Sequence, residues 1–82
     1  MVDILYFAWV RERVGLPGEA VETKAGDIAG LVEELRALSA RHADAFTDTA
    51  ALRVALDQTL GDFASPLAGV REVAFFPPMT GG

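Results

Sequence analysis

The two segments of this 82-residue chain with the strongest strand character lie at its opposite ends. Residues 2–10 are apolar at nearly every position and rich in β-branched and aromatic side chains, and residues 71–76 are similar. Such runs are typical of strands covered on both faces, so we expect both at the centre of one sheet. Neighbouring strands joined by almost the whole chain require a parallel pairing with a crossover. The fold therefore needs a crossover element between its first and last strands.

One amphipathic segment supplies that crossover. Asp27 is a typical helix N-cap, and apolar residues follow it at helical spacing. These apolar positions are Ile28, Leu31, Val32, Leu35 and Leu38. The pattern predicts one helix that ends near His42, whose place in the last turn suits the negative end of the helix dipole. We expect His42 to be a solvated helix-end residue, neither a ligand nor a base.

Shorter patterns predict the remaining strands. Residues 19–24 alternate and are expected to return beside the first strand as a hairpin, and residues 52–57 form a third strand. Residues 43–51 are small and polar apart from Phe46, which predicts a loop or one loose helical turn. Beyond the third strand, Leu60 and Phe63 are expected to attach the chain to the core.

The predicted order is ββαββ, which belongs to the α+β class. A central parallel pair with a helix in its crossover predicts the β-grasp (ubiquitin-like) fold, a mixed sheet of about four to five strands with one main helix packed across it. Residues 1–76 would form this domain and residues 77–82 a projecting tail. Tyr6 and Trp9 are expected to pack in the sheet, and Asp57 to occupy a turn.

The last residues form an unusual ending. Pro77 and Pro78 end the strand, because proline fixes φ and offers no N–H to a sheet. Gly81 and Gly82 have no Cβ, so they form a slim end that can enter a narrow tunnel. Extended from Pro77, the tail would reach about 20 Å, at about 3.3 Å per residue. The arrangement is suited to present the Gly82 carboxylate to another protein.

The composition excludes several classes of function. A net charge of −5 argues against a nucleic-acid partner, and no apolar run is long enough to span a membrane. The chain has no cysteine, so it offers neither a disulfide nor a Cys-based metal site, and we expect a cytoplasmic protein. It has one histidine, and the sequence offers no evident pairing of a nucleophile with a base. We therefore expect a carrier whose chemistry is completed by partners.

Two motifs carry a resemblance to a known family. Residues 5–12 read Leu-Tyr-Phe-Ala-Trp-Val-Arg-Glu, with Gly15 following, and residues 72–82 read Glu-Val-Ala-Phe-Phe-Pro-Pro-Met-Thr-Gly-Gly. Together they resemble the small subunits of molybdopterin synthase, which are ubiquitin-like sulfur carriers. The sequence departs from the family pattern at Asp57, where the family has Asn, and at residues 69–71, where the family has an acidic residue, Gly and another acidic residue. Both departures lie in predicted turns.

The resemblance implies a reaction cycle on the tail. An E1-like enzyme that uses ATP would adenylate Gly82, and a sulfur donor would convert the adenylate to a thiocarboxylate. The tail residues Met79, Thr80 and Gly81 would then enter the active site of a large subunit, where the thiocarboxylate donates sulfur to a cyclic pyranopterin precursor and forms the molybdopterin dithiolene. The chain itself would bind no cofactor and no metal.

The resemblance also implies an interface with that large subunit, in a heterotetramer built on a large-subunit dimer. The expected contact residues are Phe75, Phe76, Pro77 and Pro78. Side chains alternate along a strand, so one phenylalanine belongs to the core and the other faces the partner; the sequence leaves open which. It also leaves open whether Arg11, Glu12 and Arg13 form a solvated turn or a partner contact.

Three alternatives remain at this point. One is a sulfur carrier of the same fold that serves thiamine synthesis or tRNA thiolation, although such tails normally lack Phe-Phe-Pro-Pro. A second is a ubiquitin-type modifier that forms isopeptide bonds, and a third is an interaction module whose Gly-Gly is incidental. The adduct formed at Gly82 distinguishes the first two, and deletion of Gly81 and Gly82 tests the third.

Overall fold

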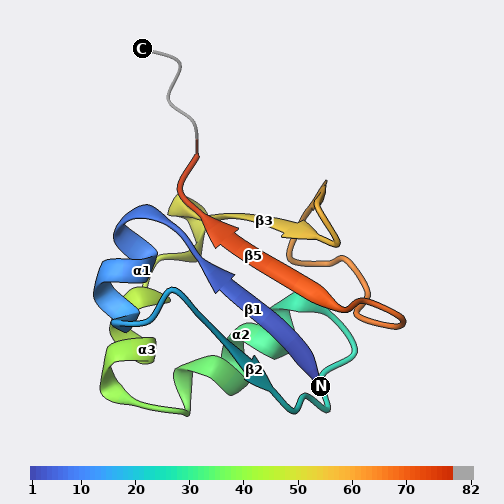
Figure 1. The fold of residues 1–82 in the computed structure, drawn as a ribbon, viewed down its shortest axis with the longest axis horizontal. Helices are drawn as coiled ribbons and strands as arrows, with labels where there is room; N and C mark the ends of the chain where they lie inside the picture. Colours follow the sequence, from blue (N-terminus) through green and yellow to red (C-terminus); the bar gives the residue numbers. More distant parts are fainter. Residues whose placement is uncertain (79–82) are drawn as a thin grey trace.

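A five-stranded mixed sheet with strand order β2-β1-β5-β3-β4 forms one layer of the molecule. The structure is a computed structural model and describes residues 1–78. The strands are β1 (Val2–Tyr6), β2 (Gly18–Val21), β3 (Arg53–Leu56), β4 (Thr59–Gly61) and β5 (Glu72–Phe76). β1 and β5 pair in parallel near the sheet centre, with Ile4 opposite Val73, and the other pairs are antiparallel. The predicted β-grasp fold is therefore confirmed (Figure 1).

Helix α2 (Ile28–Arg36) crosses behind the sheet in Figure 1. The side chain of Asp27 accepts a hydrogen bond from the Gly30 N–H at 2.8 Å, so the predicted N-cap is confirmed. The first four positions of the predicted apolar stripe are buried, namely Ile28, Leu31, Val32 and Leu35. The expected continuation to His42 is wrong, because the helix ends at Arg36 and Leu38 is 53% exposed.

A separate helix begins where α2 was expected to continue. The Ser39 hydroxyl accepts a hydrogen bond from the His42 N–H and caps α3 (Ala40–Ala45), and a 3-10 turn, η1 (Thr49–Ala51), precedes β3. Residues 43–51, predicted as a loop or one loose helical turn, therefore contain the end of α3 and the 3-10 turn η1. Phe46 is fully buried after α3, and its ring makes edge contacts with Tyr6 and Phe75.

The largest error of sequence reasoning concerns residues 7–14. The first strand ends at Tyr6, and the chain then forms helix α1 (Ala8–Val14), so Trp9 lies on a helix and not in the sheet. Val10 and Val14, one helical turn apart, are both buried against the core. Gly15 closes the helix in the left-handed conformation with φ 90°, and its N–H donates to the Arg11 carbonyl.

The turn after β3 behaves as predicted, but the segment that follows does not. Asp57 and Gln58 both have positive φ, 49° and 70°, as a tight two-residue hairpin requires. They lead into β4, which the sequence did not reveal. Leu60 on this strand is 70% exposed, so its expected role in the core is wrong, whereas Phe63 is partly buried against the core as expected. Within residues 1–78, no helix is long and apolar enough to cross a membrane.

Candidate functional site

The end of β5 shows which phenylalanine faces outward. Phe75 is fully buried and its ring lies 5.0 Å from that of Phe46 in the core. Phe76 is half-buried and projects from the opposite face of the sheet, and half-buried Pro77 and Pro78 follow it. Pro77 and Pro78 therefore lie directly beyond the strand end, as predicted. The other predicted tail residues, Met79, Thr80, Gly81 and Gly82, lie outside the described residues, and their roles stay predictions.

The face of the sheet opposite α2 carries a continuous apolar row, here called the middle row. Register pairs join Leu5 to Ala74, Ala74 to Ala55 and Ala55 to Leu60, so these four residues lie side by side across β1, β5, β3 and β4. Partners in register share a face of a sheet. The row combines small side chains at its centre with the exposed Leu60 at the sheet edge, so a flat partner surface can approach it closely.

A second row lies beside it at the end of the sheet where β5 ends, and we call it the aromatic row. Phe7 follows Leu5 by two positions, and its N–H donates to the Phe75 carbonyl at 3.1 Å, which extends the β1–β5 pairing by one residue. Phe7 is 46% exposed, and this extension places it next to Phe76, whose register partner on β3 is Arg53. Exposed aromatic groups flanked by an arginine are typical of the central anchors of protein interfaces.

Sequence reasoning missed Phe7 and Leu60 as surface residues. Phe7 had been assigned to the interior of a two-sided strand and Leu60 to the core. A shorter first strand would have placed Phe7 at a strand end, and the helical spacing of Val10 and Val14 was the signal for that. The exposure of Leu60 depends on β4, a strand of three residues that has no clear sequence signature.

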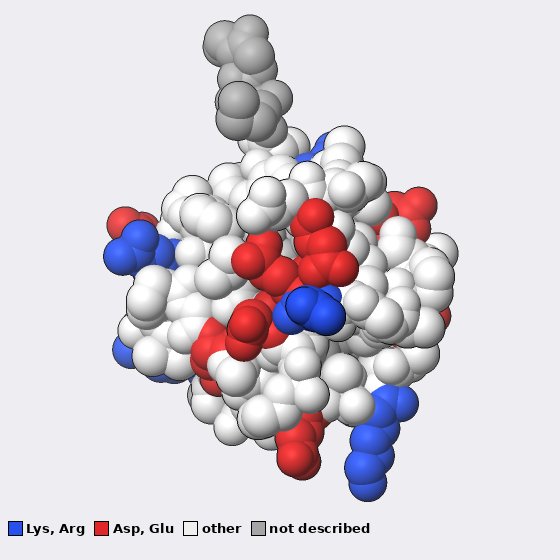
Figure 2. All heavy atoms as spheres, turned by 45° about the vertical axis from the view of Figure 1, so that its right-hand side comes forward, with Lys and Arg blue, Asp and Glu red and all other residues white. Residues whose placement is uncertain are grey.

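Acidic residues occupy the opposite end of the same face. Asp3 is the register partner of Glu72, and the Asp57 carboxylate accepts hydrogen bonds from the N–H groups of Arg71 and Glu72, each at 3.0 Å. The confirmed turn residue Asp57 thus also ties the start of β5 to the hairpin. Figure 2 shows acidic side chains gathered around one basic side chain, with mostly uncharged surface above them. The face therefore changes from acidic to apolar toward the end of β5.

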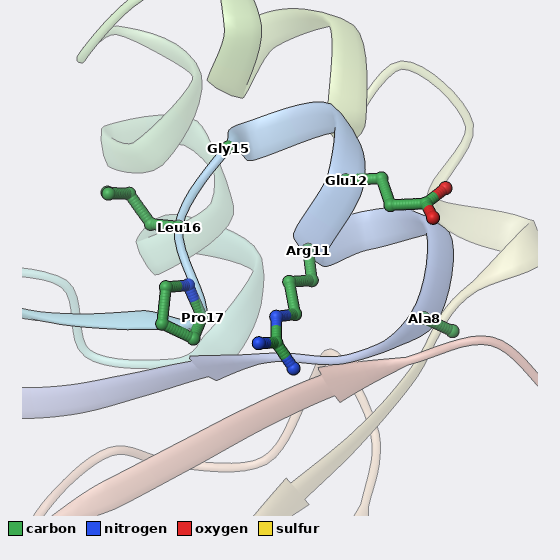
Figure 3. Close-up of a pocket in the computed structure, with 6 residues that line it drawn as sticks. All are labelled: Ala8, Arg11, Glu12, Gly15, Leu16 and Pro17. Carbon is green, nitrogen blue, oxygen red and sulfur yellow. The ribbon is translucent and has the colours of Figure 1, made fainter.

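Arg11, Glu12 and Arg13 lie on helix α1, so the solvated turn that was one alternative for them is wrong. Arg13 lies over the Trp9 ring, with its guanidinium carbon 4.7 Å from the ring centroid. Arg11 and Glu12 border a hollow of about 550 Å³ between α1 and the segment that leads to β2. In Figure 3, the Arg11 side chain extends toward the strands and Leu16 points away from them. The hollow adjoins the aromatic row through Ala8, which follows Phe7.

His42 is buried, so its predicted place in solvent is wrong. Its Nε2 lies 2.6 Å from the Glu19 carboxylate, which also accepts a hydrogen bond from the Tyr6 hydroxyl at 2.8 Å. Burial and this neighbouring carboxylate raise the pKa of Tyr6. The cluster joins α3, β2 and β1, and its polar groups are mutually hydrogen-bonded.

One further contact differs from the sequence expectation. The Ser39 hydroxyl lies 2.7 Å from Nδ1 of His42, although no pairing of a nucleophile with a base was expected. That hydroxyl also accepts the N–H that caps α3, which makes it a structural group. Within residues 1–78, no three His, Cys, Asp or Glu side chains gather in a way that could hold a metal ion.

Comparisons with known proteins agree with this architecture. Residues 4–82 match the model of the ThiS family. The chain is 43% identical over 82 residues to the molybdopterin synthase sulfur carrier subunit of Escherichia coli (strain K12) and 34% identical to that of Haemophilus influenzae, with 100% of each chain covered. The predicted resemblance is therefore confirmed.

Two solved structures share the fold. SAMP1 from Haloferax volcanii has a TM-score of 0.72 at 20% identity, with 99% of this chain and 98% of that chain covered. A protein described as molybdopterin converting factor subunit 1, from Pyrococcus furiosus, has a TM-score of 0.72 at 23% identity, with 95% and 97% covered. At these identities the likeness concerns the fold alone. The family match over nearly the whole chain and the two full-length relatives decide the assignment: this chain belongs to the ThiS family, together with the molybdopterin synthase sulfur carrier subunits.

Proposed function

We propose that this chain is the sulfur carrier subunit of a molybdopterin synthase and that Gly82 carries the sulfur. The observation that carries the proposal is the full-length similarity to two such subunits, with Phe-Phe-Pro-Pro and Gly-Gly at the end of the chain. The structure supports it by the position of β5, an inner strand that ends beside the aromatic row. Pro77 and Pro78 then stiffen the chain that leads to the tail.

The proposed chemistry takes place on the Gly82 carboxylate in two steps. A carboxylate oxygen attacks the α-phosphorus of ATP on an E1-like enzyme, and pyrophosphate leaves, which turns a poor electrophile into a mixed anhydride. Sulfur at the sulfide oxidation level, supplied by a donor, then attacks the acyl carbon and AMP leaves. The product is a thiocarboxylate. The activating enzyme binds the ATP, and this chain needs no cofactor of its own.

The proposed acceptor is the cyclic pyranopterin precursor, bound to the large subunit. Met79, Thr80 and Gly81 would carry the thiocarboxylate into that active site, which holds the catalytic residues. The precursor carries phosphate and the tail is anionic, so the large subunit has to supply Lys or Arg groups that bring two anions together. A heterotetramer built on a large-subunit dimer is the expected assembly, and we expect the cycle to run in the cytoplasm.

The proposed interface with the large subunit is the aromatic and middle rows of the open sheet face. It includes Phe76, Pro77 and Pro78 as predicted, and adds Phe7 and Leu60. Phe75 contributes from inside, because its burial sets the position of its neighbour Phe76. A partner seated on this surface would cover the place where the tail leaves the sheet, which is the geometry that insertion of the tail requires.

Intact mass spectrometry of the protein from cells with a functional activating enzyme tests the proposal. We expect a species in which one oxygen is replaced by sulfur, and we expect it to be absent after deletion of Gly82. The deletion should also abolish dithiolene formation while the melting temperature stays unchanged, because the residues that form the core lie between Val2 and Phe75. A truncated protein that still supports dithiolene formation would refute the carrier role, and a lysine-linked conjugate would favour the ubiquitin-type alternative.

A further inference from the structure

Helix α1 is too short to define its own position. It has seven residues, and isolated helices of that length are not stable in water. Its N-cap, Phe7, provides no side-chain hydrogen bond to the first turn, and Ala8 has φ 54°, a left-handed conformation that disfavours residues with a Cβ. The place of α1 on the domain therefore depends on contacts with other elements.

Arg41 of α3 makes the polar contact at the C-terminal end of α1. Its Nε donates to the Arg13 carbonyl at 3.0 Å and its Nη2 to the Glu12 carbonyl at 3.1 Å. The last carbonyls of a helix have no partner within the helix and carry its negative dipole end. A guanidinium satisfies two of them with one rigid, positively charged group.

Gly15 leaves room for this arrangement. A Cβ at Gly15 would lie 2.9 Å from the guanidinium carbon of Arg41, well inside a normal contact distance. The guanidinium thus lies directly against the backbone at the end of α1. Figure 3 labels Gly15 at this end of the helix.

The opposite end of α1 carries Phe7. The backbone of Phe7 is hydrogen-bonded to β5, and its side chain is 46% exposed in the aromatic row. Val10 and Val14 fix which side of α1 faces the core, but apolar contacts are non-directional and resist sliding weakly. The two hydrogen bonds from Arg41 are directional, so they set where α1 stops along its axis.

We infer that Arg41 is a positioning residue for partner recognition, which acts through α1 to hold Phe7 in the aromatic row. The inference rests on the proposed function, because it needs a partner on that face. Arg41 lies at the end of α1 opposite to Phe7 and donates to backbone carbonyls, so we expect its effect on binding to pass through the helix. Loss of its two hydrogen bonds should weaken binding only while the Phe7 ring is present.

A double-mutant cycle tests this coupling. The affinity for the large subunit of the same organism's molybdopterin synthase is measured for wild type, Arg41→Met, Phe7→Ala and the double variant. Met keeps most of the aliphatic stem and removes every donor. We expect Arg41→Met to raise Kd about three- to tenfold, a typical range for coupled residues, and to have no further effect in the Phe7→Ala background.

Arg36→Met is the matched control. Arg36 also donates from its guanidinium to a backbone carbonyl, that of Phe46, with distances of 2.9 and 2.6 Å, but it lies on α2 away from α1. It should lower the melting temperature at least as much as Arg41→Met and leave Kd unchanged. In the protein alone, hydrogen exchange at the Phe7 amide should rise in Arg41→Met and not in Arg36→Met. If Arg41→Met lowers the melting temperature strongly, Arg41→Gln, which keeps a single donor nitrogen but no charge, replaces it in the cycle.

Additive losses in the cycle, or equal losses of affinity from Arg41→Met and Arg36→Met, would overturn the positioning role and leave the proposed function intact. Failure of the wild-type chain to bind the large subunit would refute the proposed partner, and the inference with it. A wild type that binds, with an Arg41 effect that vanishes without the Phe7 ring, is the result that supports the inference.

Discussion

Replacing Phe75 and Phe76 in turn should separate stability from partner binding. Phe75 is fully buried and packs edge-on against Phe46, so Phe75→Ala should cost about 3–5 kcal/mol. The free energy of unfolding of a domain of 82 residues is typically about 4–12 kcal/mol, so Phe75→Ala should remove a large fraction of it. Phe75→Leu keeps most of the volume and should cost about 1–2 kcal/mol. Phe76→Ala, at a half-buried position, should lower the free energy of unfolding by at most about 1 kcal/mol in the protein alone.

Partner binding should show the opposite order, with the larger loss of affinity on substitution of Phe76. A central aromatic anchor costs about 2 kcal/mol or more on truncation, so Phe76→Ala should weaken binding to the large subunit roughly thirtyfold or more. Phe75→Leu should bind nearly as well as wild type once folded. Urea denaturation gives the free energies of unfolding, and titration calorimetry gives the affinities. Equal losses of stability from Phe75→Leu and Phe76→Ala, with unchanged binding in both, would refute this division of roles.

Two further predictions concern stability. Tyr6 is the lone tyrosine, and its pKa is raised above its ordinary value of 10.0, so the unfolded chain loses the phenol proton first and stability should fall by up to about 1.4 kcal/mol per pH unit above about pH 10. Denaturation over a pH series measures this slope, which Tyr6→Phe should remove; a slope that persists in that variant would assign it to another group. Gly15→Ala should cost about 1–2 kcal/mol, because it places a Cβ at φ 90° against Arg41, and an unchanged urea midpoint would contradict that strain.

The sequence was sufficient for the sheet because its signals there are local and strong. The apolar runs at the two ends of the chain, together with the Asp27 cap, predicted the parallel pairing of β1 and β5 and the position of α2. An apolar run alone does not show where a strand changes to a helix, and so α1 was missed. The decisive contacts for that change, the burial of Val10 and Val14, form only when the helix packs on the core.

Polar contacts between side chains far apart in the sequence could not be predicted from the sequence. The burial of His42 is possible because its ring has a polar partner. The Glu19 carboxylate, on a strand distant in the sequence, lies 2.6 Å from Nε2 of His42. Ser39 begins a new helix, and this break turns Leu38 out into solvent. The pairing of His42 with Glu19 does not follow from periodicity, because it depends on which elements meet after folding. The Ser39 cap is a local signal that the apolar periodicity did not reveal. The candidate surface was predicted at Pro77, Pro78 and one of Phe75 and Phe76. Its extension to other strands could be found only from the strand register.

The parallel pairing of β1 and β5 makes the partner surface and the tail a single unit. Because both strands point the same way, Phe7 after β1 and Phe76 at the end of β5 meet at the same end of the sheet. An antiparallel pair would have separated these rings by the length of the sheet. The crossover through α2 is therefore what places two aromatic rings next to the point where Pro77 leaves the sheet. A partner that covers both rings is seated, by the same contacts, at the root of the tail.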